Sequence, residues 1–83
     1  MKVVELISKK DCHLCDRALE VLMRAGKQVA FDLRVRKLTE ADAEFDLYKE
    51  RFPVVTIDGR FAFQYRVPED ELVLLLGKNS ETG

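Results

Sequence analysis

The sequence of 83 residues predicts an α/β domain with the element order β-α-β-α-β-β-α. Two observations carry this prediction. An apolar run at the start of the chain is followed by apolar residues at helical spacing and then by a run that alternates apolar and polar residues. Later, an Asp-Gly pair separates two β-rich runs, which is a strong hairpin signal. A strand–helix–strand unit of this length is expected to be parallel, so the sheet is mixed, with a parallel first half and an antiparallel second half.

The first half of the chain supplies a strand, a helix and a second strand. Val3–Ile7 is almost continuously apolar, as expected for a central strand that is covered on both faces. A helical pattern begins near His13, and Gly26 is a plausible C-terminal stop. From residue 31 on, apolar residues (Phe31, Leu33 and Val35) alternate with charged ones (Asp32, Arg34 and Arg36). This alternation is typical of a strand with one solvated face or an exposed edge. The apolar positions of the helix are Leu14, Ala18, Val21, Leu22 and Ala25.

The second half opens with a helix and continues with the hairpin. Thr39–Asp42 resembles a capping box, and Pro53 ends the helix because proline offers no N–H and restricts the residue before it. Val54–Ile57 and Phe61–Tyr65 are the two hairpin strands. One face of the helix carries Ala41, Phe45, Tyr48 and Phe52, and we expect its three aromatic residues to lie in the core.

A last helix is expected to follow the hairpin. Pro68 suits its first position, and Gly77 marks its end. We therefore expect one domain over residues 1–77 and a flexible C-terminal tail over residues 78–83.

The charge balance excludes several classes of partner. Lysine and arginine number 14 against 15 acidic residues, which leaves a formal net charge of −1. This balance gives no electrostatic reason to expect binding to nucleic acid or to an anionic membrane. No run approaches the roughly 20 apolar residues that a membrane span needs, and the first residues do not read as a signal peptide. We expect a cytoplasmic protein, in which a purely structural disulfide would be unusual.

Both cysteines of the sequence lie in the stretch Lys9–Cys15, between the first strand and the first helix. Two residues between cysteines at a helix start allow the two sulfurs to face each other across one turn. Cys12 would lie at the helix N-terminus, where unpaired N–H groups and the helix dipole favour a thiolate, the attacking species. Cys15 would then be the resolving thiol. The pattern predicts thiol–disulfide exchange.

The residues around Cys12 act on its charge in opposite directions. Lys9 and Lys10 add positive potential, and Asp11 opposes it. His13 is the only histidine, and two interpretations of it stay open: it stabilises the Cys12 thiolate, or it is an exposed helix-start residue without a special role.

Two other uses of the cysteines stay open beside exchange chemistry. They could form an inert buried pair, or they could ligate a metal or an iron–sulfur cluster in a non-catalytic binding module. A mononuclear zinc site wants four ligands, whereas this chain offers two cysteines and one histidine. Metal binding would therefore need a second chain or glutathione thiolates, and we predict no metal site within the chain.

Three features together resemble the glutaredoxin-like branch of the thioredoxin superfamily. They are Cys12-His13-Leu14-Cys15 after the first strand, Phe52-Pro53-Val54-Val55 opening the third, and the Asp58-Gly59 hairpin before the last helix. The resemblance runs from about residue 3 to residue 77. It implies a thioredoxin-like, four-stranded sheet in the order 2-1-3-4 with helices on both faces. It also implies a cis Phe52–Pro53 peptide beside the sulfurs, with the Phe52 backbone facing the substrate.

The resemblance further implies a function for the site. It is that of a thiol–disulfide oxidoreductase that reduces protein disulfides or glutathione mixed disulfides, with Cys12 attacking and Cys15 resolving. Lys9 matches a basic residue that meets the glutathione carboxylate in this family, and His13, Phe52 and Pro53 would border the substrate. Glutathione is a possible reductant; we expect no tightly bound cofactor and a monomeric protein. The Gly-Gly turn of typical glutaredoxins is absent from residues 65–70, as is the proline of the typical motif.

Overall fold

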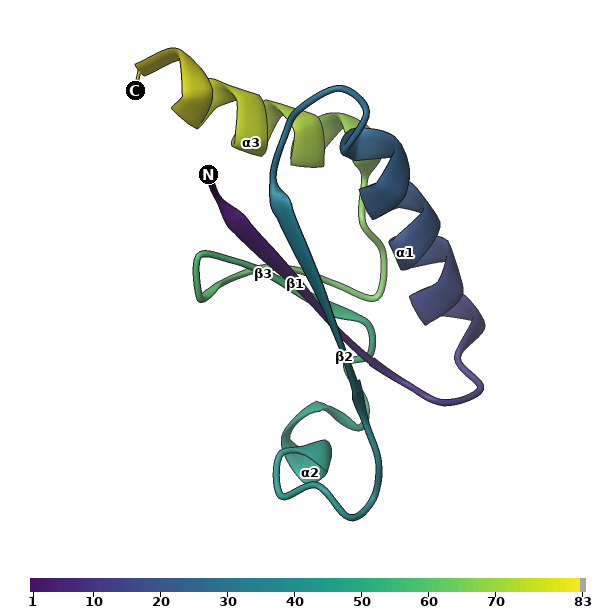
Figure 1. Cartoon of the computed structure of the whole chain (residues 1–83). Helices are drawn as coiled ribbons and strands as arrows, with labels where there is room; N and C mark the ends of the chain where they lie inside the picture. Colours follow the sequence, from purple (N-terminus) through teal and green to yellow (C-terminus); the bar gives the residue numbers. More distant parts are fainter. Residues whose placement is uncertain (83) are drawn as a thin grey trace.

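A four-stranded sheet in the order β2-β1-β3-β4 forms the centre of the computed structural model (Figure 1), which describes the backbone of residues 1–82 and the side chains of residues 1–77. β1 is parallel to β2 and antiparallel to β3, and β3 is antiparallel to β4. The predicted mixed sheet, its order and its element sequence are confirmed. The elements are β1 (Val3–Lys9), α1 (His13–Ala25), β2 (Asp32–Leu38), α2 (Phe45–Tyr48), β3 (Val54–Ile57), β4 (Arg60–Gln64) and α3 (Glu69–Thr82).

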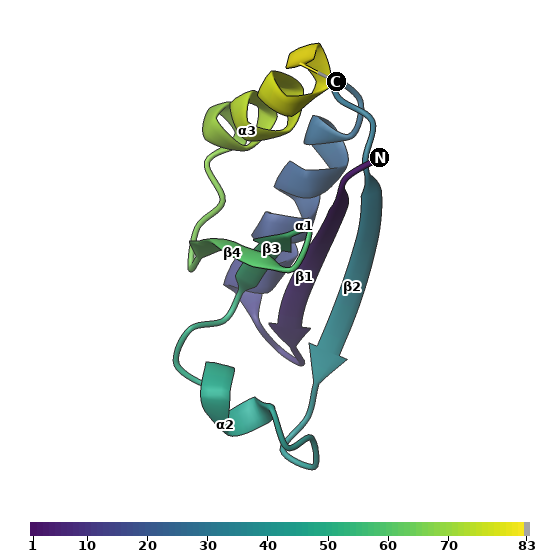
Figure 2. The same ribbon diagram turned by 90° about the vertical axis from the view of Figure 1, so that its left-hand side faces the viewer.

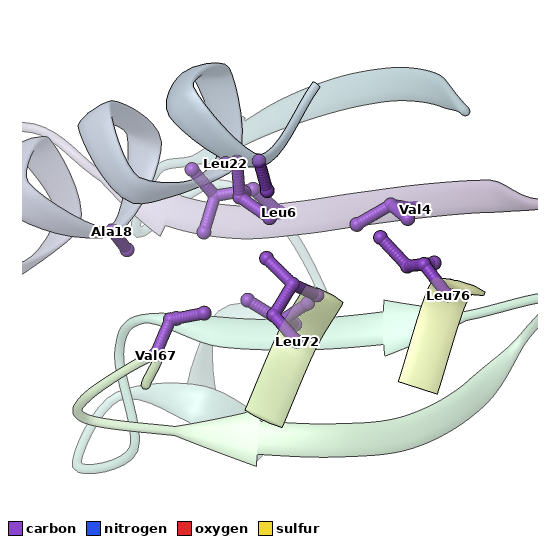
Figure 3. Packing of buried hydrophobic residues seen from close by; sticks show 9 residues of the cluster. Val4, Leu6, Ala18, Leu22, Val67, Leu72 and Leu76 are labelled. Atoms are coloured by element: carbon purple, nitrogen blue, oxygen red, sulfur yellow. The ribbon is translucent and has the colours of Figure 1, made fainter. Parts of the chain in front are cut away.

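The main core lies between one face of the sheet and the two long helices, α1 and α3 (Figure 2). Val4 and Leu6 point to this face, and Figure 3 shows Leu72 and Leu76 of α3 directed toward them. Each fully buried side chain of this size contributes roughly 1.5–3 kcal/mol through burial. The remaining buried members of the cluster are Ala18, Leu22, Ala25, Val55 and Val67.

The opposite face of the sheet is covered only at one end. Ile7 and Val54, which pair across β1 and β3, point to this face and form a second buried cluster with Leu38, Cys15 and Phe52. Phe45 and Tyr48 of α2 pack against that cluster. β1 is therefore not covered equally on its two faces, although its apolar run predicts cover on both. The middle of β1 carries half-buried Glu5, whose carboxylate lies 3.7 Å from the Arg36 guanidinium.

The second helix is much shorter than the sequence predicts. One bond of the capping box forms, since the Thr39 N–H donates to the Asp42 carboxylate at 2.7 Å. The Asp42 N–H instead donates to the Thr39 backbone carbonyl, a series of turns follows, and only Phe45–Tyr48 is helical. Acidic residues four apart repel one another in a helix, so a longer helix would set Glu40 against Glu44 and Asp42 against Asp46. Glu44 instead accepts a hydrogen bond from Arg36 on β2 at 2.7 Å.

The last helix is longer than the sequence predicts. α3 continues through Gly77 to Thr82, so the expected stop at Gly77 was wrong. Packing of Leu72 and Leu76 holds the helix against the sheet, which outweighs the low helical propensity of one glycine. The predicted flexible tail covers residues 78–83. The side chains of these residues, and the backbone of residue 83, lie outside the described part of the chain, so the tail stays a prediction. In the part that the structure describes, none of the helices is both long and apolar enough to span a membrane.

Candidate redox site

Cys12 caps the N-terminus of α1. Asp11 adopts a positive φ of 55°, a conformation that aspartate tolerates better than most residues, and this turn carries the chain from β1 into the helix. Cys12 is extended, with φ −119° and ψ 105°, and its Sγ accepts a hydrogen bond from the Cys15 N–H at 3.2 Å. Its carbonyl accepts the first helical bond, from the Asp16 N–H. Cys12 thus takes the place of the usual Ser, Thr or Asp cap.

The two thiols differ in burial. Both are free; Cys12 is half-buried, whereas Cys15 is only 3% exposed. Burial, with a smaller contribution from its interaction with Cys12, raises the pKa of Cys15 from 9.0 to about 12. Cys15 is therefore held as a thiol near neutral pH. Cys12 is the sulfur that an incoming molecule can reach, and the helix N-terminus stabilises negative charge there.

Phe52 and Pro53 are both buried, and the peptide bond between them is cis, as the resemblance implies. Phe52 belongs to the same apolar cluster as Cys15, with Cys12 packed against it. The Lys9 Nζ lies 5.7 Å from the centre of the Phe52 ring, within the range of a cation–π contact. The structure therefore brings together Lys9, Cys12, Cys15 and Phe52, and their roles stay predictions.

His13 lies at the first position of α1, and its side chain is exposed. Within the described part of the chain, no hydrogen bond or ion pair joins it to another side chain. This placement matches the interpretation of an exposed helix-start residue, and a role toward the Cys12 thiolate stays a prediction.

Sequence reasoning missed a hollow of about 210 Å³ beside the motif. It lies between α1 and the segment that joins β4 to α3, and Leu14, Arg17, Tyr65 and Arg66 contribute to its lining. Leu14 is 42% exposed and Tyr65 is 45% exposed. In the sequence, the apolar Leu14 between the two cysteines was the one available signal, since the other side of the hollow comes from a distant part of the chain.

Tyr65 connects this hollow to Pro53. Its N–H donates to the Pro53 carbonyl at 2.9 Å, and its hydroxyl donates to the Glu50 backbone carbonyl at 2.6 Å. Its φ of 67° lies in the left-handed region, which costs a non-glycine residue roughly 1–2 kcal/mol. Tyr65 thus takes a glycine-like backbone conformation in the segment where typical glutaredoxins carry two glycines.

A metal site finds no support in the described side chains. Among residues 1–77, no group of three or more His, Cys, Asp and Glu side chains is placed to hold a metal ion. The two cysteines would need further ligands from outside those residues.

A family model described as "Glutaredoxin-like domain (DUF836)" matches residues 3–77 of the chain. The chain belongs to this family. The match covers every element from β1 to the middle of α3, including both cysteines, Phe52 and Pro53.

Solved structures support the same fold. The chain is similar to target protein XcR50 from X. campestris, with 28% identity, a TM-score of 0.74, and 90% of this chain and 96% of that chain covered. It also resembles chloroplastic thioredoxin z, at 15% identity and a TM-score of 0.69, with 100% and 80% covered. Glutaredoxin 1 from Francisella tularensis matches at 13% identity and a TM-score of 0.52, with 99% and 98% covered.

No protein with a curated description matches the sequence significantly. Family membership and the two distant neighbours therefore establish a glutaredoxin-like, thioredoxin-fold domain with two nearby cysteines, which is the scaffold for a redox or binding role.

Proposed function

We propose that the protein is a thiol–disulfide oxidoreductase that reduces protein disulfides or glutathione mixed disulfides. The observation that carries this proposal is the pairing of a reachable Cys12 at a helix N-terminus with a buried Cys15 whose N–H donates to the Cys12 sulfur. An N–H that donates to sulfur stabilises the negative charge of a thiolate, and the thiolate is the nucleophile in exchange. An inert structural pair would have no need of this asymmetry.

In the first step, the Cys12 thiolate attacks one sulfur of the substrate disulfide. A new S–S bond forms between Cys12 and that sulfur, and the substrate S–S bond breaks. The departing substrate sulfur leaves as a thiolate and takes up a proton from water. The product is a mixed disulfide between Cys12 and the substrate.

In the second step, Cys15 resolves the mixed disulfide. Cys15 gives up its proton to water, and its sulfur attacks the Cys12 sulfur, so that a Cys12–Cys15 bond forms and the bond to the substrate breaks. The second substrate sulfur leaves as a thiolate and takes up a proton from water. The substrate has gained two electrons and two protons, and Cys12 and Cys15 are left as a disulfide. A low-molecular-weight thiol such as glutathione, supplying two electrons per cycle, would restore the dithiol.

Lys9, Phe52 and Pro53 are proposed to position the substrate. Within the described part of the chain, the backbone N–H and C=O of Phe52 have no hydrogen-bond partner, so they are available to an extended substrate segment beside Cys12. The Pro53 carbonyl is occupied by Tyr65. Lys9 is proposed to meet a substrate carboxylate, such as that of glutathione, from its place over the Phe52 ring.

Two cysteine variants test this proposal. Cys12→Ser should abolish reduction of a model disulfide, because it removes the attacking sulfur. Cys15→Ser should instead accumulate a mixed disulfide, which intact-protein mass spectrometry detects as added substrate mass. Normal turnover by Cys12→Ser would refute the assignment.

A non-catalytic binding module with an iron–sulfur cluster or a protein partner is the competing hypothesis. It predicts a coloured, dimeric protein on anaerobic purification and little disulfide reduction. The oxidoreductase proposal instead predicts a colourless monomer without a tightly bound cofactor, acting in the cytoplasm.

A further inference from the structure

Two hollows form a continuous surface from the redox motif to the edge of the sheet. The hollow beside the motif includes Leu14, Arg17, Tyr65 and Arg66. A second hollow, of about 650 Å³, follows β4 and includes Arg51, Phe61 and the same Arg66. Since Arg66 lines both hollows, they adjoin. β4 is the last strand in the sheet order, so this surface runs along an edge strand.

The arginines of this surface lack internal partners. Among the side chains of residues 1–77, no carboxylate lies within ion-pair distance of Arg17, Arg51 or Arg66. Three other arginines differ: Arg24 pairs with Glu69, Arg34 with Asp32, and Arg36 with Glu5 and Glu44. The hollows at this edge therefore hold three arginines whose charge is not neutralised by a neighbouring carboxylate among the described side chains.

Exposed aromatic side chains line the same two hollows. Phe61 is 62% exposed and Tyr65 is 45% exposed. Tyrosine and arginine are enriched among the residues that dominate protein interfaces, and guanidinium groups bind carboxylates with two parallel hydrogen bonds. An open surface on an edge strand, lined by exposed rings and guanidinium groups, suits an extended polypeptide with acidic side chains.

We infer that this surface, the arginine track (Arg17, Arg51, Arg66, Phe61 and Tyr65), binds an acidic segment of the protein whose disulfide Cys12 attacks. The inference rests on the proposed function and names its substrate class: disulfides flanked by Asp and Glu. Docking along β4 would deliver the neighbouring disulfide to Cys12 past Leu14. Complementary charge would speed association and fix the register of the segment.

Binding is tested apart from chemistry. The full chain carrying Cys12→Ser and Cys15→Ser is titrated against a labelled peptide that contains Asp and Glu but no cysteine, with its Asn and Gln counterpart as the control. We expect the acidic peptide alone to bind. When Arg51→Gln and Arg66→Gln are introduced into this cysteine-free chain, peptide binding should weaken about tenfold, which corresponds to about 1.4 kcal/mol. Rising salt concentration should weaken peptide binding as well.

Arg34→Gln is the matched control, because Arg34 is an exposed arginine on β2, at the opposite edge of the sheet. It should leave peptide binding unchanged. Equal loss in the Arg34 variant, or equal binding of both peptides, would overturn the arginine track.

A kinetic experiment separates this inference from the proposed function. With the dithiol intact, kcat/KM for a disulfide peptide with acidic flanks should exceed that for neutral flanks about tenfold, and Arg51→Gln with Arg66→Gln should remove the preference. Exchange without preference and without binding would refute docking and leave the oxidoreductase standing. Binding of the acidic peptide without any exchange would refute the oxidoreductase and retain docking.

A second copy of the chain is the other occupant to exclude, since residues 40–50 are rich in acidic side chains. Sedimentation at increasing concentration should show a monomer. A dimer that is lost on Arg51→Gln and Arg66→Gln, without peptide binding, would overturn the inference.

Discussion

At the scale of single residues, the site depends on the different surroundings of two chemically identical thiols. Cys12 sits at a helix end with its sulfur accepting an N–H, while Cys15, three residues on, is buried in the second cluster. Sequence spacing places Cys12 at the helix start and Cys15 one turn further in, but it does not show how deeply either is buried. The difference in burial comes from the side chains that β1, β3 and α2 bring against Cys15.

The raised pKa of Cys15 makes stability depend on pH. In the unfolded chain this thiol ionises near 9.0, whereas in the folded protein it ionises near 12. Its contribution to stability is therefore fully present below pH 9 and is lost as the pH rises toward 12. The free energy of unfolding, measured by urea titration, should fall more steeply between pH 9 and pH 12 in the native chain than in Cys15→Ala. Parallel curves would contradict this expectation.

The Tyr65 hydroxyl holds the segment beside the motif to the residues that precede Pro53. Tyr65→Phe removes its hydrogen bond to the Glu50 carbonyl and should lower the free energy of unfolding by about 1 kcal/mol. Tyr48→Phe is the matched control, because the Tyr48 hydroxyl makes no hydrogen bond within the described residues. Equal effects of the two substitutions in chemical denaturation would show that the Glu50 contact contributes nothing.

At the scale of elements, local signals located both ends of α1, the start of α3 and the hairpin, but misplaced both ends of α2 and the end of α3. The N-terminus of α1 follows from the motif, and the hairpin of β3 and β4 from Asp58-Gly59, where Gly59 has a positive φ of 83°. The two wrong predictions concern how far α2 and α3 extend. Length is decided by packing: α3 has buried leucines on the core, whereas α2 buries none of its four residues.

Gly77 distinguishes the predicted end of α3 from the observed one. In a continuous helix, Gly77→Ala should raise stability by up to about 1 kcal/mol, since a Cβ there would meet only Val29, at an ordinary 3.9 Å. A glycine that ended the helix with positive φ would give the opposite sign. Gly59→Ala is the reference for that case and should destabilise by about 1 kcal/mol although its surroundings are open. Thermal denaturation of both variants decides the matter.

At the scale of the whole molecule, an 83-residue domain has little stability to lose. Leu22 is fully buried between α1 and the sheet. Leu22→Ala should lower the free energy of unfolding by about 2–5 kcal/mol, a large share of the 5–15 kcal/mol typical of domains. Leu74→Ala, at a side chain that is 69% exposed, should change it by less than about 0.5 kcal/mol. If urea titration showed similar losses of the free energy of unfolding in Leu22→Ala and Leu74→Ala, Leu22 would not be part of the core that stabilises the fold.

The distribution of charge is also a property of the whole molecule. The composition gives a net charge of −1, which correctly describes the chain as nearly neutral in total. It says nothing of Arg17, Arg51 and Arg66, which come from three separate parts of the chain and line adjoining hollows only after the sheet has formed. Three other arginines, Arg24, Arg34 and Arg36, pair with carboxylates, and the sequence does not distinguish the two groups.

The sequence by itself determined what depends on neighbours within a few positions. That includes the order of strands and helices, Cys12 at a helix start, the hairpin at Asp58-Gly59 and, through family resemblance, the sheet order and the cis Phe52–Pro53 peptide. These signals are local because hydrogen-bonding periodicity, turn conformation and proline geometry act over short stretches of backbone.

Only the tertiary structure decided the burial of Cys15, the place of Lys9 over Phe52, the hydrogen bond from Tyr65 to Glu50 and the lengths of α2 and α3. Each depends on contacts between segments that lie far apart in the chain or on how much apolar surface a neighbouring element covers. Burial and long-range packing set these quantities, and neither can be read from the spacing of residues along one strand or helix.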